Sequence, residues 1–149
     1  MSSKIVIKNK KAAHLYEIKE KHIAGMQLKG TEIKSIRQGK ASLVDTYCYF
    51  KNSELWLKGM HITEYDHSTY FNHEPKRERK LLLKKQELRK LERKVKEKGD
   101  TIIALQVFIS EKGYAKVEIA LASGKKKYDK REEIKRKDMK RDMERLQKY

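Results

Sequence analysis

The sequence predicts a mainly β protein: a small antiparallel β-barrel with flanking helices and a basic C-terminal tail. Three observations lead to this fold class. Apolar and aromatic residues gather in segments 14–28, 43–65 and 101–121, where they alternate in part with polar residues, as strands do. Few helices separate these segments, which favours a barrel over a parallel sheet. Two other blocks, 75–98 and 124–149, are dense in charge and indicate a helix and a tail.

The turns between apolar runs mark the strands. Asn52–Ser53 stands between two short apolar runs and is typical of a hairpin turn. The clearest hairpin joins 102–109 to 114–121 through Glu111–Gly113, because apolar and polar residues alternate on both sides of a turn that contains glycine.

A short helix is predicted after the first apolar segment. Thr31 is suited to cap its N-terminus, and the pattern runs through Gln38 to a stop at Gly39. Ile33 and Ile36 share one face of this helix, which would pack on the barrel.

A longer helix is predicted from about Pro75, a residue suited to a first helical turn, to Lys98 before Gly99. Its apolar stripe would seat it on the barrel. The stripe consists of Leu81, Leu88, Leu91 and Val95. The other faces are almost wholly basic and form either a solvated surface or a surface for a polyanion.

The length of 149 residues fits one domain of ordinary size followed by a tail. We place the barrel domain at 1–123 and the tail at 124–149. Twelve basic residues minus six acidic ones give the tail a net charge of +6. Its few large aliphatic side chains cannot bury enough surface to hold a helix alone. We therefore expect a tail that is disordered when free and helical on a partner; the alternative is a helix always docked on the barrel.

Charge indicates the class of partner. Thirty-eight Lys and Arg against twenty-one Asp and Glu give a net charge of +17. Nucleic acid is the first candidate, because each neutralised phosphate releases condensed counterions. An anionic membrane is disfavoured, because the basic segments have few aromatic anchors and no apolar run approaches the roughly 18–20 residues that span a bilayer. Residues 1–11 lack the apolar core of a signal peptide, so a cytoplasmic location is expected.

Signals for catalysis are missing from the sequence. Cys48 is the single cysteine and lies in a strand pattern, which predicts a buried structural thiol. The five histidines lack the close spacing of metal ligands, and no phosphate-binding glycine loop or nucleophile motif occurs. The acids are spread among basic residues rather than clustered for a metal. We therefore expect no enzyme, no cofactor and no metal site.

Three motifs follow one another along the chain. The first combines Asn-Lys-Lys-Ala at 9–12, His14, Tyr16 and Gly25 with Gly-Thr-Glu-Ile-Lys-Ser-Ile-Arg at 30–37. The second is Arg-x-Arg-Lys-Leu-Leu-Leu at 77–83, and the third is Gly-Lys-Lys-Lys-Tyr-Asp-Lys-Arg at 124–131. In order and spacing they resemble the small protein B family, also called SsrA-binding or tmRNA-binding proteins. The resemblance runs from about residue 5 to the C-terminus.

This resemblance implies an OB-fold-like barrel that binds the tRNA-like domain of transfer-messenger RNA and delivers it to stalled ribosomes for trans-translation. It implies that the C-terminal tail engages the decoding centre and the empty message channel of the small subunit. It also implies elongation factor Tu as a partner within the delivery complex. The alternative is a generic basic RNA-binding or ribosomal protein without a rescue role.

The resemblance further assigns the contact residues. RNA-binding residues are expected at Asn9, Lys10, Lys11, Glu32, Lys34, Arg37, Arg77, Arg79, Lys80, Leu82, Lys84 and Lys116. Ribosome-engaging residues of the tail are expected at Gly124, Lys125, Lys126, Tyr128, Asp129, Lys130 and Arg131.

The role of Glu32 has an alternative, and the orientation of Lys116 can be predicted from its neighbours. Glu32 would orient Lys34 or Arg37 or accept a hydrogen bond from RNA; the alternative is an acid that stabilises the first turn of its helix. Lys116 alternates with Ala115 and Val117 and should point outward.

Some positions depart from the family pattern or stay open. The family often has an acid before Ala24-Gly25, where this chain has Ile23, and Asn or His after the leucines, where it has Lys84. Tyr65, Tyr70 and Phe71 are candidates for stacking on bases, although such residues more often close the end of a core.

Overall fold

The computed structural model describes residues 6–66 and 72–124. Their elements, in chain order, are β1 (Val6–Lys8), α1 (Ala12–Leu15), β2 (Tyr16–Met26), α2 (Gly30–Arg37), β3 (Ala41–Ser42), β4 (Tyr47–Lys51), β5 (Glu54–Lys58), β6 (His61–Ile62), β7 (Arg79–Leu82), α3 (Lys85–Lys98), β8 (Thr101–Ile109) and β9 (Ala115–Gly124).

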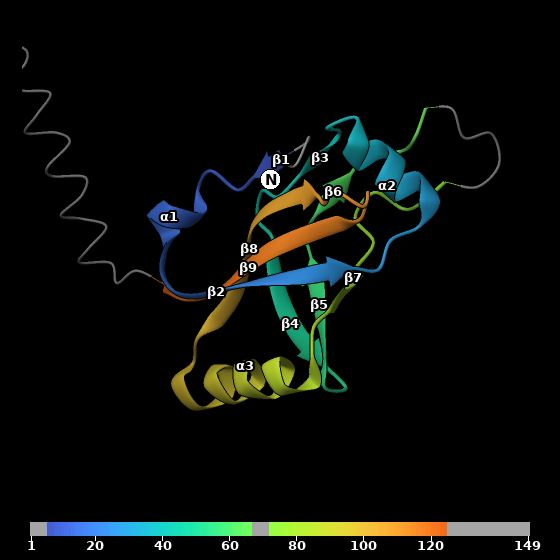
Figure 1. The fold of residues 1–149 in the computed structure, drawn as a ribbon. Coiled ribbons are helices and arrows are strands. Elements are labelled where there is room, and N and C mark those ends of the chain that lie inside the picture. Colours follow the sequence, from blue (N-terminus) through green and yellow to red (C-terminus); the bar gives the residue numbers. More distant parts are fainter. Residues whose placement is uncertain (1–5, 67–71, 125–149) are drawn as a thin grey trace, which may run out of the picture.

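The barrel forms because an antiparallel sheet closes on itself. Neighbouring strands follow the order β1-β8-β4-β5-β7-β2-β9, and β8 also pairs with β9, which completes a ring. β1 and β4 lie one after the other along the free edge of β8. Closure pairs the backbone groups that an open sheet would leave at its edges. Figure 1 shows α2 and α3 at opposite ends of this barrel. The mainly β, ring-like fold class predicted from the sequence is confirmed.

Both predicted hairpins are present. Lys51 pairs with Glu54, and the turn residues Asn52 and Ser53 have φ angles of 53° and 62°. Positive φ at both central residues suits the right-handed twist of the flanking strands, and asparagine adopts it more readily than most residues. The β8–β9 hairpin turns at Glu111–Gly113, as the alternating pattern predicted.

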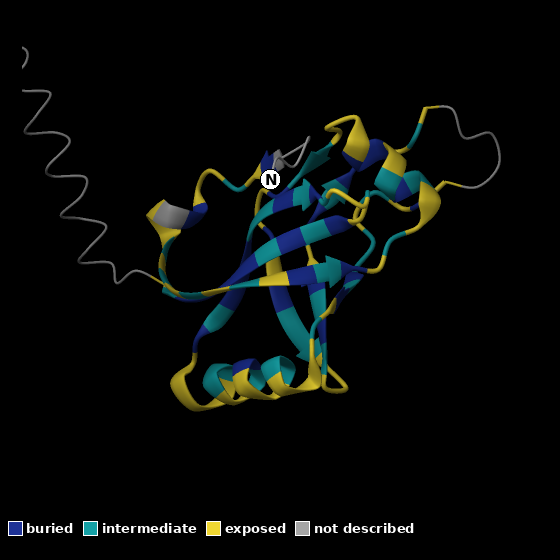
Figure 2. Cartoon of the chain, viewed as in Figure 1, coloured by how far each residue is buried: buried dark blue, intermediate teal, exposed yellow. Residues whose placement is uncertain are grey.

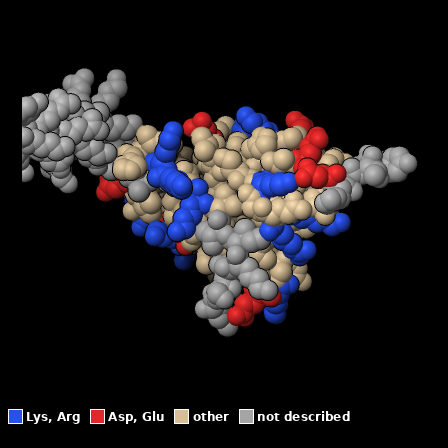
Figure 3. All heavy atoms as spheres, turned by 90° about the horizontal axis from the view of Figure 1, so that it is seen from above, with Lys and Arg blue, Asp and Glu red and all other residues tan. Residues whose placement is uncertain are grey.

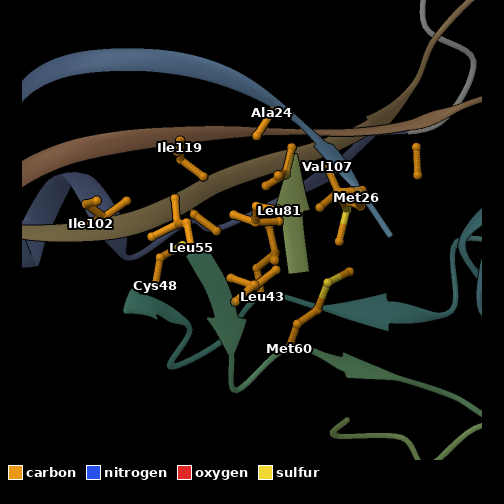
Figure 4. Packing of buried hydrophobic residues seen from close by; sticks show 14 of the residues in the cluster. Ala24, Met26, Leu43, Cys48, Leu55, Met60, Leu81, Ile102, Val107 and Ile119 are labelled. Atoms are coloured by element: carbon orange, nitrogen blue, oxygen red, sulfur yellow. The ribbon is translucent and has the colours of Figure 1, made fainter. Parts of the chain in front are cut away.

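The core fills the barrel with aliphatic side chains from every wall. Leu55, Leu81 and Ile119 have at most 1% of their surface exposed and point toward one another (Figure 4). Cys48 belongs to this core, and burial raises the pKa of its thiol far above the usual range. The predicted structural thiol is therefore confirmed. Figure 2 shows the burial pattern: inward strand residues are dark, and the outer face of α3 is exposed.

Two predicted starts of elements were wrong. The segment 14–28 was expected to be extended, but His14 and Leu15 end the short helix α1, and β2 begins only at Tyr16. Thr31 does not cap α2: the N-cap is Lys29, whose backbone N–H donates to the Glu32 side chain at 2.8 Å. The predicted stop is confirmed, because Gly39 follows the helix with a φ of 73°.

The predicted helix from Pro75 to Lys98 is wrong in its first part. Arg79–Leu82 forms β7, which fills the gap between β5 and β2, and α3 begins at Lys85. Burial with a period of two explains the difference, because Arg79 and Leu81 face inward while Leu82 faces outward. The stripe of Leu88, Leu91 and Val95 does seat α3 on the barrel, as predicted.

Two neighbouring leucines test the assignment of β7. Leu81 is 1% exposed and Leu82 is 51% exposed. Leu81→Ala should lower the free energy of unfolding by roughly 2–5 kcal/mol because it leaves a cavity, whereas Leu82→Ala should change it by about 0.5 kcal/mol or less. Urea denaturation of the two variants measures both values, and equal losses would contradict the strand register.

No helix within residues 6–66 and 72–124 is long and apolar enough to cross a membrane.

Candidate nucleic-acid interface

Three neighbouring strands bring two of the predicted RNA-binding residues, Leu82 and Lys116, onto one face of the barrel beside Gly25. Leu82 on β7, Gly25 on β2 and Lys116 on β9 are partners across the sheet. A Cβ atom on Gly25 would lie 3.4 Å from the Cβ of Leu82 and 3.8 Å from the Nζ of Lys116. The lysine ammonium therefore lies close beside the bare backbone of β2. We call Ile23, Gly25, Leu82 and Lys116 the β2–β7–β9 platform.

The platform combines charge with exposed apolar surface. Ile23 and Leu82 are 58% and 51% exposed, although both are large and aliphatic. Lys116 points outward between the buried Ala115 and Val117, which confirms the predicted alternation. Such a surface can pair an ammonium with a phosphate while a ribose or base lies against the aliphatic groups.

One lysine of the second motif and the lysine that follows the motif lie near the platform. Lys80 shares the outward face of β7 with Leu82, and its ammonium pairs with Glu54 at 3.1 Å. Lys84 is the exposed N-cap residue of α3, two positions beyond Leu82. Lys84 can add to the positive charge around the platform, whereas Glu54 offsets the charge of Lys80.

Glu32 and Arg79 form a buried ion pair instead of a surface contact. Neither side chain has exposed surface, and the Nε of Arg79 donates to the Oε2 of Glu32. Arg77 donates to the Oε1 of the same carboxylate at 2.5 Å. The remaining Arg79 donors reach the carbonyl oxygens of Met60 (2.8 Å) and Pro75 (3.1 Å). We therefore withdraw Glu32 and Arg79 as direct RNA contacts.

This ion pair ties α2 to the barrel. Glu32 lies in the first turn of α2, and Arg79 begins β7. His73 adds a second tie, because its Nδ1 lies 2.9 Å from the Thr31 hydroxyl and its Nε2 lies 2.8 Å from the Ile62 carbonyl oxygen. A carbonyl only accepts, so Nε2 carries a proton. The polar contacts thus fix the position of α2, whereas Glu32 does not orient Lys34 or Arg37 as predicted.

Acid is expected to weaken this tie. Desolvation raises the pKa of Glu32, but hydrogen bonds from Arg77 and the Lys29 backbone and the charge of Arg79 outweigh it, so the pKa lies below its ordinary 4.5. The unfolded chain then binds a proton first as the pH falls. The free energy of unfolding should decrease as the pH drops below about 4.5. Urea denaturation between neutral and acidic pH checks this, and a decrease no steeper than in Glu32→Ala would contradict it.

Lys34 and Arg37 are exposed on α2. The ammonium of Lys34 lies 5.4 Å from the centre of the Tyr65 ring, and Arg37 donates to the Gly113 carbonyl at 3.3 Å. Tyr65 thus contacts a predicted RNA-binding lysine, and its role as a stacking residue stays a prediction. Tyr70 and Phe71 lie outside the described residues.

Asn9, Lys10 and Lys11 follow β1, which is separated from β2 by β8 and β9 in the sheet. β1 ends at Lys8, so these residues form the turn before α1, not part of a strand. The side-chain amide of Asn9 donates to the Ala104 carbonyl at 3.0 Å and anchors the turn. The turn borders a cleft of about 560 Å³, near the start of β2 at Tyr16.

The basic side chains form more than one group on the surface. Figure 3 shows basic side chains gathered toward the α1 end of the face that it displays, with uncharged surface between them and those toward the opposite end. Within the described ranges, no group of His, Cys, Asp and Glu residues could hold a metal ion.

The described part of the third motif is its first residue. Gly124 ends β9 opposite Tyr16, so it belongs to the sheet. The other predicted ribosome-engaging residues, Lys125 to Arg131, lie outside the described residues. The boundary between barrel and tail stays a prediction.

Comparison with known proteins decides the family. The family model described as "SmpB protein" matches residues 6–149. The chain belongs to the SmpB family.

Curated relatives agree over nearly the whole length. The SsrA-binding protein of Phocaeicola vulgatus is 60% identical over 142 residues, 95% of this chain and 95% of the relative. That of Cytophaga hutchinsonii is 60% identical over 140 residues, 94% of this chain and 92% of the relative.

A solved structure agrees on the fold. A chain of the structure called "tmRNA-SmpB: a journey to the center of the bacterial ribosome" has a TM-score of 0.68 and 47% identity; the match covers 82% of this chain and 85% of that one. Membership of the SmpB family agrees with the resemblance seen in the motifs.

Sequence reasoning named Gly25 and Arg79 but missed their structural roles. Gly25 appeared only as part of a family motif, although a glycine inside a strand often marks a close backbone approach. The buried state of Arg79 was also missed. Its spacing of two from Leu81 was a usable signal, but the long basic run that surrounds both residues favoured a helix.

Proposed function

We propose that the protein binds the tRNA-like domain of transfer-messenger RNA and delivers it to stalled ribosomes for trans-translation. One observation carries the proposal: motif residues from distant segments, Gly25 and Leu82, meet with Lys116 on one exposed platform. The relatives named SsrA-binding proteins, and the neighbour whose name joins tmRNA to SmpB, support it.

The platform suits a folded RNA better than a single exposed base. Its three strands are paired with one another, and A-form RNA presents riboses and phosphates across a shallow groove. The ammonium of Lys116 can pair with a phosphate, and the ribose can lie on the backbone of Gly25. Lys84 and the exposed basic residues of α2, Lys34 and Arg37, extend the positive surface. Binding of this kind involves no catalysis, and we propose a non-enzymatic, cytoplasmic role.

The tail has a separate role in this proposal. It engages the decoding centre and the empty message channel through the residues from Gly124 to Arg131, and elongation factor Tu joins the delivery complex. These assignments rest on the resemblance of the third motif. The alternative, a generic basic RNA binder, predicts little preference among folded RNAs.

A competition experiment tests the proposal. The full chain and a truncation that ends at Gly124 are titrated with the tRNA-like domain at physiological salt, with bulk tRNA and duplex RNA as competitors. We expect both proteins to bind with similar affinity and to resist both competitors, because the platform lies within the barrel. Equal displacement by duplex RNA, or loss of binding with the tail, would favour the generic binder.

A further inference from the structure

A row of outward side chains crosses the sheet at the platform. Ile23 on β2 is the cross-strand partner of Glu118 on β9, and Glu118 is the partner of Gln106 on β8. These three strands lie side by side (Figure 1). Glu118 is partly exposed and alternates with buried residues of β9, so it shares the outer face with Lys116. The two charged residues are two positions apart on one strand, which corresponds to roughly 7 Å.

The carboxylate of Glu118 is unpaired. Among the described residues it takes part in no ion pair and accepts no hydrogen bond. The ammonium of Lys116 lies beside Gly25 instead, 3.8 Å from the position of a Cβ atom on that glycine. By contrast, Glu54 on β5 pairs with Lys80 at 3.1 Å. Glu118 therefore presents free acceptor oxygens on a face that is proposed to bind RNA.

An unpaired carboxylate on a nucleic-acid interface selects a hydrogen-bond donor. An ionised carboxylate only accepts hydrogen bonds, and it repels phosphate groups. The ribose 2′-hydroxyl is a donor that every RNA nucleotide carries, and A-form RNA displays it across its shallow groove. A hydroxyl also accepts, and the side-chain amide of Gln106 can donate to it. The exposed Ile23 gives the ribose carbons an apolar surface, so the whole row suits the edge of a ribose.

We propose that Glu118 accepts a hydrogen bond from a ribose 2′-hydroxyl and thereby makes the platform select RNA over DNA. Lys116 pairs with a phosphate while Glu118 holds the neighbouring ribose. A deoxyribose lacks the hydroxyl, so DNA would cover the carboxylate without giving it a donor, and burial of an unpaired charge is unfavourable. The inference rests on the proposed function, because it concerns the same platform, and it names the chemical group that the platform recognises.

Matched nucleic acids test the role of Glu118. Full-length wild type, Glu118→Ala and Glu118→Gln are titrated by fluorescence anisotropy with the tRNA-like domain, made as RNA and as DNA of the same sequence. We expect wild type to prefer RNA and Glu118→Ala to reduce that preference by about tenfold, as for the loss of one good polar contact. RNA affinity should fall and DNA affinity should rise. Glu118→Gln should keep part of the preference, because its amide oxygen still accepts a hydrogen bond.

Glu97 supplies the control for net charge, because it is an exposed acid on α3. Glu97→Ala should raise both affinities equally, by less than about twofold at physiological salt, and should leave their ratio unchanged. Circular dichroism and urea denaturation verify that all variants keep the fold. Equal gains for RNA and DNA in Glu118→Ala, or a wild type without preference for RNA, would overturn the inference.

A second pair of ligands separates this inference from the proposed function. Two duplexes of unrelated sequence, one of RNA and one of DNA, are titrated in the same way. If wild type binds the tRNA-like domain no better than the RNA duplex, the proposed function fails. The preference for RNA over DNA on these duplexes, and its loss in Glu118→Ala, still decides the role of Glu118.

Discussion

Replacement of Glu32 by Ala is expected to lower the free energy of unfolding by roughly 3–5 kcal/mol. The variant leaves the guanidinium of Arg79 buried without its carboxylate, and an unpaired buried charge is strongly unfavourable. It also removes the acceptor for the Lys29 backbone N–H at the start of α2. Urea denaturation of the full chain at neutral pH measures the loss.

Glu97 provides the matched control, because it is an exposed acid on α3 and its replacement changes the net charge equally. Glu97→Ala should shift the free energy of unfolding by about 0.5 kcal/mol or less. Similar small losses in both variants would show that the buried ion pair does not hold α2. If Glu32→Ala kept full stability and lost only RNA affinity, Glu32 would return to the set of direct contacts.

The second large effect is expected at Gly25. Gly25→Val should weaken binding of the tRNA-like domain by about tenfold or more, because each good contact to RNA is worth roughly 1–3 kcal/mol. The valine methyl groups would extend into the space beside the Lys116 ammonium and would lift a ribose off the backbone. Valine suits a strand, so the barrel should still form. Titration at physiological salt gives the loss, and circular dichroism checks the fold.

The control adds the same side chain where space is open. No atom lies within 4 Å of a Cβ built on Gly30, at the start of α2. Gly30→Val should therefore keep RNA affinity within about twofold. A second variant removes the charge of the platform. For Lys116→Gln, the slope of the logarithm of the binding constant against the logarithm of the salt concentration should decrease in magnitude by about one. Wild-type affinity in Gly25→Val would remove the platform from the interface.

Local rules predicted the parts of the fold that depend on neighbouring residues. The turns at Asn52–Ser53 and Glu111–Gly113 were predictable, because turn chemistry and alternation act over a few residues. β7 was not. Its four residues, Arg79–Leu82, carry two basic side chains and sit within a charged run that is typical of a helix. These residues form a strand because they pair with both β5 and β2, which is a tertiary effect.

The interface was predictable as a set of residues but not as an arrangement. The motifs named Lys11 and Leu82 together, yet Lys11 lines the cleft beside α1, whereas Leu82 lies on β7 opposite Gly25. Burial also decided roles that residue type could not. An arginine in a basic protein suggests a phosphate contact. Arg79, however, has no exposed surface and donates hydrogen bonds to Glu32, Met60 and Pro75.

The pairing of β2 with β9 has a consequence for synthesis of the chain. Tyr16 meets Gly124, so the barrel closes across a loop of roughly 100 residues. Contacts this distant in sequence form late and slowly, and β9 also completes the ring through β8. During translation the earlier strands must wait, with their apolar faces uncovered, until β9 has left the exit tunnel. A nascent chain cut short before Ala115 lacks β9 and cannot close its barrel.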